Sequence, residues 1–113
     1  MVTRTKTKPE VLLERRRHEL KPKSGGGLLS YEVWGIVEDG RTHVTRYNLA
    51  YINLALCAVD HGRVLGYDNA HGYHHRHHMG QVEPVEHTSF EKTAERFQEE
   101  VMALLKAHKE PKS

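Results

Sequence analysis

The sequence predicts a single α+β domain, in which an antiparallel meander of four to five strands carries a C-terminal amphipathic helix on one face. Three observations predict it. β-Branched and aromatic residues gather between Leu29 and Asp68 in short runs that turn residues separate. The connections between these runs are too short for the crossover that parallel strands require. Between Thr88 and Lys106, apolar residues then recur at three- and four-residue intervals, which is the period of a helix that covers a sheet.

The length and composition predict one domain that does not associate with a membrane. The chain has 113 residues, of which 37% are hydrophobic, and this suffices for one modest core. No apolar run approaches the roughly 20 residues of a membrane span, and no signal-peptide core follows the basic N-terminus. We therefore expect a cytoplasmic protein. Cys57 is the single cysteine, which excludes an internal disulfide, and its apolar neighbours predict a small buried residue.

Positive charge is concentrated at the N-terminus. Residues 1–23 carry eight Lys or Arg against three Glu, whereas the remainder carries nine against twelve Asp or Glu. We predict a basic, partly flexible arm over residues 1–27 and the α+β domain over residues 28–109. Within the arm, residues 10–20 fit a helical stripe slightly better than a strand face. This stretch holds the basic run that we select for binding: Arg15, Arg16 and Arg17. Such a run binds phosphates or an acidic partner, or it is only a solvated surface.

Turn signals divide the middle of the chain into strands. Asp39 followed by Gly40 is a strong two-residue hairpin signal, so we predict a strand on each side of it, with a bend or bulge near Asn48 in the second. Residues 54–60 are a third apolar run. A turn at His61 and Gly62 then leads into a fourth strand over residues 63–68.

The C-terminal part is predicted to be a link followed by a helix. Residues 81–87 are predicted to be extended and unpaired, because Pro84 interrupts a β ladder. The helix is predicted to begin after Thr88, which forms a capping box with Glu91 three residues later. An acidic first half and a basic end suit the helix dipole.

The stretch from Tyr67 to Gly80 departs most from average composition, since five of the ten histidines lie within eight residues. Alternate side chains of an extended segment share a face. One face is therefore predicted to carry His71, Tyr73, His75 and His77. The other is predicted to carry His74, Arg76 and His78. Neither face is apolar, so the segment is predicted to lie at a sheet edge or to line a cleft, where it is the first candidate for chemistry.

One hypothesis for this stretch is acid–base chemistry on RNA without a metal ion. Cleavage through the 2′-hydroxyl needs a base, an acid and a cation that holds the phosphate. We select His75 and His77 as the acid–base pair, because imidazole exchanges protons near neutral pH. Arg76 is selected to hold the phosphate, and Tyr73 to stack on a base or to carry a proton.

Two alternatives remain open. Histidine ligates zinc and other divalent transition metals, and His71, His75 and His77 would be the ligands, with Asp68 as the one nearby carboxylate. We rank this below a protein with no cofactor. In the other alternative the histidines form a polar edge or a pH-dependent surface, and the chain is a non-enzymatic module that binds a protein or nucleic acid.

Several motifs in this region resemble those of a known family. They are Arg63-Val64-Leu65-Gly66-Tyr67-Asp68-Asn69-Ala70-His71-Gly72, His75-Arg76-His77, Glu83-Pro84-Val85-Glu86 and Thr88-Ser89-Phe90-Glu91-Lys92. Together, across residues 35–105, they resemble the TumE-like toxins of bacterial and archaeal toxin–antitoxin pairs. The resemblance implies a cytoplasmic toxin that a helix-turn-helix antitoxin neutralises, and a first strand where residues 10–20 slightly favour a helix. His74, His78 and the Gly-rich insertion together with the basic arm depart from the family pattern.

The resemblance and the residues together give the sequence-based prediction. The chain is predicted to be a toxin component that acts on RNA or on translation, with metal-independent endoribonuclease activity and a homo-oligomer both left open. The motif positions that the resemblance carries over are Tyr67, Asp68, Asn69, His75, Arg76 and His77. The candidate catalytic residues are Asp68, Tyr73, His75, Arg76 and His77. The candidate binding residues are Arg15, Arg16, Arg17, Tyr67, Asn69 and His71.

Overall fold

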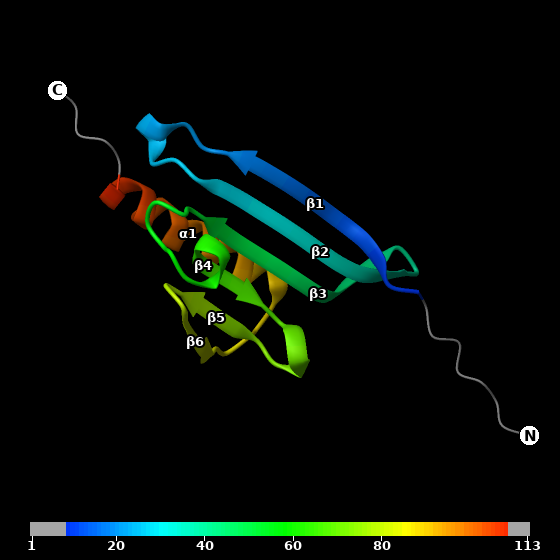
Figure 1. Ribbon diagram of the computed structural model, residues 1–113. Helices are drawn as coiled ribbons and strands as arrows, with labels where there is room; N and C mark the ends of the chain where they lie inside the picture. The colour runs from blue at the N-terminus through cyan, green and yellow to red at the C-terminus, as the bar shows by residue number, and fades with distance from the viewer. Residues whose placement is uncertain (1–8, 109–113) are drawn as a thin grey trace, which may run out of the picture.

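The computed structural model describes residues 9–108, and this part of the chain forms six strands and one α-helix (Figure 1). The elements are β1 (Val11–Glu19), β2 (Leu28–Glu38), β3 (Arg41–Ile52), β4 (Arg63–Asp68), β5 (His75–His78), β6 (Gln81–Pro84) and α1 (Phe90–His108). Residues 1–8 of the predicted arm and Lys109 at the predicted end of the domain lie outside the described residues.

The six strands form one antiparallel sheet whose spatial order is the order in the sequence, β1-β2-β3-β4-β5-β6. The predicted meander and its covering helix are therefore confirmed. The predicted number of four to five strands is too low, because β1 and β6 were not counted as strands of the sheet.

Strand β1 corrects the slight preference for a helix over residues 10–20. It pairs with β2 from Val11 opposite Gly35 to Glu19 opposite Leu28. Its side chains are almost all exposed, as expected at the edge of a sheet. An edge strand with two exposed faces shows no alternation of polarity, so its own sequence does not identify it as a strand. Its conformation is determined by pairing with β2. The first strand that the family resemblance implies is found here.

Strand β6 corrects the unpaired link that we predicted over residues 81–87. Gln81 pairs with His78 and Pro84 pairs with His75. Proline is compatible with this position because β6 is the other edge of the sheet and Pro84 is its last residue, where a missing N–H costs little.

The hairpin at Asp39 and Gly40 is confirmed, since both residues have positive φ angles, 51° and 73°, as a two-residue hairpin turn requires. The irregularity expected near Asn48 is a bulge at Thr45, where the register with β2 shifts. Residues 54–60 are not a strand. They form a loop and the start of a short 3₁₀ turn, in which Cys57 is buried as predicted while Leu54 and Val59 are exposed.

Helix α1 begins one residue later than the capping box predicts. Ser89 Oγ accepts a hydrogen bond from the backbone N–H of Lys92 at 3.1 Å, so Ser89 caps the helix and Thr88 does not. Serine and threonine are both good caps, so residue type alone does not distinguish Ser89 from Thr88.

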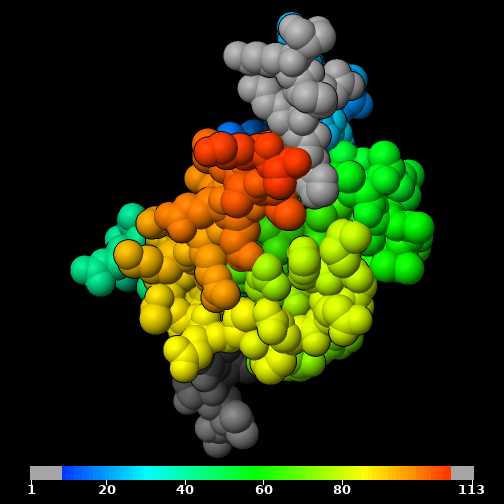
Figure 2. Space-filling model, turned by 90° about the vertical axis from the view of Figure 1, so that its left-hand side faces the viewer, coloured from blue at the N-terminus to red at the C-terminus, as the bar shows by residue number. Residues whose placement is uncertain are grey.

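One face of the sheet is covered by α1, and the other is open. Phe97 and Val101 of α1 pack on the covered face against tyrosines and aliphatic residues of β2, β3 and β4. The loop that follows β3 rises on the opposite side, and Figure 2 shows this loop (green) and α1 (orange) on opposite flanks of the molecule. Within residues 9–108, no helix combines the length and the apolar composition needed to cross a bilayer.

Candidate functional site

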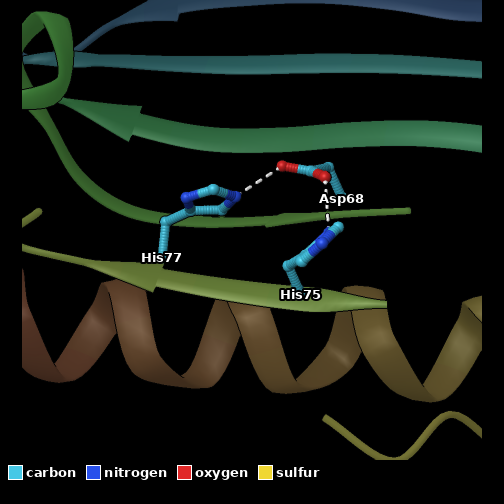
Figure 3. A group of neighbouring side chains, drawn as sticks. All are labelled: Asp68, His75 and His77. Carbon is cyan, nitrogen blue, oxygen red and sulfur yellow. Dashed lines mark hydrogen bonds and ion pairs between the residues drawn. The ribbon is translucent and has the colours of Figure 1, made fainter. Parts of the chain in front are cut away.

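The side chains of β5, within the histidine-rich stretch, alternate between the two faces of the sheet as predicted. Strand β5 pairs with β4 so that His75 lies opposite Asp68, and Arg76 lies opposite Tyr67. His75 and His77 point to the open face, where they meet Asp68 (Figure 3). Arg76 points to the covered face, where it meets Glu100 of α1.

Asp68 connects the two histidines of β5. His75 Nδ1 lies 3.1 Å from Asp68 Oδ1, and His77 Nε2 lies 2.7 Å from Asp68 Oδ2. The backbone N–H of Ala70 also donates to Oδ1. Asp68 is 8% exposed and His75 is 5% exposed, so water competes little for these bonds. The carboxylate therefore fixes both imidazoles in place.

Arg63 completes this cluster, and the sequence analysis did not select it. Its guanidinium donates to both carboxylate oxygens of Asp60, at 2.7 and 3.1 Å, and lies 3.5 Å from Asp68. Arg63 Nη2 is 3.0 Å from His77 Nδ1. A guanidinium only donates hydrogen bonds, so Nδ1 of His77 accepts and Nε2 carries the proton that goes to Asp68. Both ring nitrogens of His77 are therefore occupied.

A bulge in β4 explains why Arg63 reaches the open face. Leu65 pairs with Tyr51 but Arg63 pairs with Ile52, which leaves Val64 as the extra residue. In a regular strand alternate residues share a face, so without the bulge Arg63 would lie on the covered face with Leu65. The only sequence signal for Arg63 is the acidic residue three positions before it, Asp60, which becomes its partner.

His75 differs from His77 because one of its nitrogens is available. Within residues 9–108 no side chain bonds Nε2 of His75, and no fully buried side-chain nitrogen lacks a partner, so Nε2 keeps some contact with solvent although His75 is only 5% exposed. Tyr73 lies against it, with the ring centroids 3.7 Å apart and 51% of Tyr73 exposed. The open face thus presents an oriented imidazole beside an accessible phenol.

The same three side chains are the candidate metal ligands of the described chain. One ligand atom each from Asp68, His75 and His77 lies within 4.8 Å of the others. This differs from the predicted set, in which His71 took the place of Asp68. His71 lies in the turn between β4 and β5, not on the strand, and it is not a member of this group.

Tyr67 and Arg76 lie on the covered face in a network around Glu100. The Tyr67 hydroxyl and the Arg76 guanidinium both donate to the Glu100 carboxylate, and Arg76 also contacts Glu83. Burial and the bond to Glu100 raise the pKa of Tyr67 to about 12. Burial raises the pKa of Glu100, but the bonds from Arg76 and Tyr67 outweigh it, and the net pKa is below its usual value. The network binds α1 to β4 and β5, so these two predicted site residues are separated from His75.

Asn69 and His74, two further residues of the stretch, bond and stack with neighbouring residues of the fold. Asn69 Oδ1 accepts from the N–H of Tyr47 at 3.0 Å, and its amide donates to the carbonyl of Thr45 at 2.9 Å. His74 stacks on His87 with a centroid distance of 3.7 Å, and its Nδ1 is 2.7 Å from the Tyr47 hydroxyl. These contacts hold the ends of β4 and β5 against β3.

The three arginines of β1 divide between the two faces. Arg15 lies opposite Glu32 and is 3.5 Å from its carboxylate. Glu32 pairs with Asn48, which pairs with Asp68, so all three lie on the open face. Arg17 lies two residues further along the strand and therefore on the same face. Arg16 lies over the Tyr31 ring on the covered face, 4.8 Å from its centroid. Arg15 and Arg17 accordingly share a face with His75, and Arg16 does not.

Comparison with known proteins identifies the family. A family model described as Toxin TumE matches residues 4–105, which span every strand of the sheet and most of α1. The chain belongs to the TumE toxin family. No curated protein and no solved structure matches the chain significantly. Membership in the TumE family makes it a toxin component of a toxin–antitoxin system and implies an antitoxin partner. The match also places β1 within the family's domain.

Proposed function

We propose that this TumE-family toxin is a metal-independent endoribonuclease in which His75 is the general base. The observation that carries the proposal is the arrangement of His75. Its Nδ1 is bonded to a buried carboxylate, while no side chain of residues 9–108 bonds its Nε2. A carboxylate on Nδ1 holds the imidazole in the tautomer whose Nε2 lone pair accepts a proton, and it stabilises the imidazolium that results.

The reaction follows from this geometry. Nε2 of His75 removes the proton of a ribose 2′-hydroxyl, and the 2′ oxygen attacks the adjacent phosphorus. The bond from phosphorus to the 5′ oxygen breaks, and that oxygen takes a proton from Tyr73, which lies against His75 and is half exposed. The imidazolium then returns its proton to Tyr73. The products are a 2′,3′-cyclic phosphate and a 5′-hydroxyl end.

His77 and Arg76 take other roles than those first assigned to them. Both ring nitrogens of His77 are occupied, by Asp68 and Arg63, so it positions Asp68 and does not exchange protons with substrate. Arg76 supports the packing of α1. The cations that would hold phosphates are instead Arg15 and Arg17, which lie on the face that carries His75.

The test uses His75→Asn. The asparagine amide can replace Nδ1–H as the donor to Asp68 but supplies no base, so the variant should fold. The double change of His75 and His77 to alanine is less suitable, because both are largely buried and bonded to Asp68. We expect RNA cleavage by purified toxin to fall about 10²–10⁴-fold, the usual contribution of a general base. His71→Asn, in the exposed turn, is the matched control and should cleave normally.

The products and their metal dependence complete this test. Cleaved RNA should carry 2′,3′-cyclic phosphate ends, and a chelator should leave the rate unchanged. Cleavage by His75→Asn at the rate of the unmodified toxin would contradict the proposal. RNA that binds but is never cut would support the non-enzymatic alternative.

Metal binding is the second candidate, because Asp68, His75 and His77 place three ligand atoms close enough for one ion. The two arrangements exclude each other, since the N–H groups that now donate to Asp68 would have to give way to metal bonds. Zinc added to the apo protein should raise its melting temperature if the ion binds the native state only. Asp68→Asn should abolish that rise and His71→Asn should not. Cleavage that a chelator stops and zinc restores would favour this candidate.

A further inference from the structure

We propose that Trp34 and Arg46 form a nucleobase subsite on the open face, so that the substrate is single-stranded RNA. The inference rests on the proposed function, because it takes RNA to be the ligand. Trp34 lies opposite Arg46 across β2 and β3. The Arg46 guanidinium stacks over the indole, 4.7 Å from the ring centroid. Stacked planar groups of this kind are what unpaired bases stack upon.

The stack is held in position from both sides. Trp34 Nε1 donates to Glu32 at 2.8 Å, which fixes the indole. Arg46 donates through Nε and Nη2 to Glu10, at 3.1 and 2.8 Å, which fixes the guanidinium plane. The Arg46 side chain is nevertheless 55% exposed, so its outer surface is available. A base placed there would extend the stack without any rearrangement of the site.

A hollow joins this stack to the proton-transfer residues. It has a volume of about 190 Å³, and it is lined by Glu32, Trp34, Arg46, Tyr47, Asn48, Asp68 and Ala70. Asp68 is the residue that orients His75. A row of paired residues crosses four adjacent strands in the order Glu32, Asn48, Asp68 and His75. Three strand spacings are about 14 Å, so one short strand of RNA can contact the stack and His75 together.

Asn48 lies between this hollow and a second one of about 270 Å³ that Asp60 and Arg63 line. The Asn48 side chain is exposed, and Asn48 lies opposite Glu32 and Asp68 in the sheet. The amide offers a donor and an acceptor side by side, as the edge of a nucleobase does. In a duplex the bases are stacked on one another and cannot lie on Arg46. The site therefore selects unpaired RNA, with Arg15 and Arg17 of the same face available for its phosphates.

Trp34 is the only tryptophan of the chain, so its fluorescence reports on this subsite alone. The binding experiment uses His75→Asn, which bears no change at the stack, and a short single-stranded RNA of mixed sequence. The comparison ligands are the same ribose-phosphate chain without bases and the RNA paired with its complement. We expect saturable quenching by the single strand and little quenching by either comparison ligand at the same salt concentration.

Two arginine variants separate stacking from charge. Arg46→Lys keeps the charge but removes the plane, and it should weaken single-strand binding about tenfold or more, the range of a lost base stack. Arg41→Lys, an exposed arginine at the start of the same strand, is the matched control and should bind normally. Thermal melting of both variants confirms that they fold.

The outcomes distinguish this inference from the proposed function. RNA that is cleaved normally while Trp34 fluorescence stays constant, or equal affinity for the chain without bases, overturns the subsite and leaves the function standing. Quenching by single-stranded RNA together with full cleavage by His75→Asn overturns the general base and leaves the subsite. If labelled RNA shows no binding at all, both proposals fail.

Discussion

Replacing Glu100 by glutamine tests whether Arg76 supports the fold or contacts substrate. Glu100 accepts hydrogen bonds from Tyr67 and Arg76, which connects α1 to two neighbouring strands. Glutamine keeps the size of the side chain but removes the charge. The Arg76 guanidinium would then retain only Glu83 as an anionic partner, and Glu83 is largely exposed.

The magnitude follows from the burial of the pair. Losing one partner of a fully buried ion pair costs about 3–5 kcal/mol, and a hydrogen bond to a charged group contributes about 1.5–3 kcal/mol. The side chains of Arg76 and Glu100 are 20% and 27% exposed, so water compensates in part. We expect a loss of about 2 kcal/mol in the free energy of unfolding. For a domain of this size, that corresponds to a melting temperature lower by roughly 8 °C.

The effect should also depend on pH. Because the pKa of Glu100 is lower in the folded protein than its usual 4.5, its contribution is present above pH 4.5 and is lost as the pH falls through the folded-state value. The difference between the unmodified protein and Glu100→Gln should therefore shrink in acid. Thermal and urea unfolding measure it, with Glu99→Gln, exposed on the same helix, as the control. RNA cleavage at ambient temperature should survive the change. An unaltered melting temperature combined with lost cleavage would refute the structural role of Arg76.

Two further predictions concern the helix cap and the stacked histidines. Ser89→Ala should lower the free energy of unfolding by about 1 kcal/mol, whereas Thr88→Ala should change it by less than about 0.5 kcal/mol; equal effects in urea unfolding would contradict the assignment of the cap. Burial, and then the neighbouring charges of His87 and His75, lower the pKa of His74 below its ordinary 6.5, so the unfolded chain binds this proton more readily than the folded one. Stability should therefore decline as the pH falls below 6.5, and His74→Gln should flatten that decline while His71→Gln leaves it unchanged. A decline that persists in full after His74→Gln would show that other groups cause it.

The parts of the fold with a strong local signal could be predicted from the sequence. The turn at Asp39 and Gly40 needs positive φ angles that these residue types tolerate, and the stripe of α1 has an unambiguous period. Strands β1 and β6 could not be predicted in the same way. Both are edges of the sheet with mostly exposed side chains, so their sequences carry no alternation of polarity, and Pro84 argues against pairing. Their place is fixed by the neighbouring strand.

The candidate site likewise has a part that the sequence predicts and a part that depends on strand pairing. A period of two residues suffices to place His75 and His77 on one face and Arg76 on the other. It cannot show that Asp68 lies opposite His75, because that depends on the register between β4 and β5. Nor can it place Arg63, which reaches the cluster through a bulge whose position depends on pairing with β3. The sequence therefore indicates the imidazoles, but their partners emerge from tertiary structure.

The order of strands in the sheet also affects how the chain folds during synthesis. Each strand pairs with the one made just before it, so most contacts are local and pairing need not wait for distant segments. Helix α1, in contrast, follows all six strands in the sequence, and its Phe97 packs on the apolar face that carries Tyr31 and Tyr67. Until Phe97 and Val101 have left the ribosome, that face stays exposed on a sheet whose strands are already assembled. Truncation before Phe97 should therefore yield a chain that aggregates through its tyrosine face.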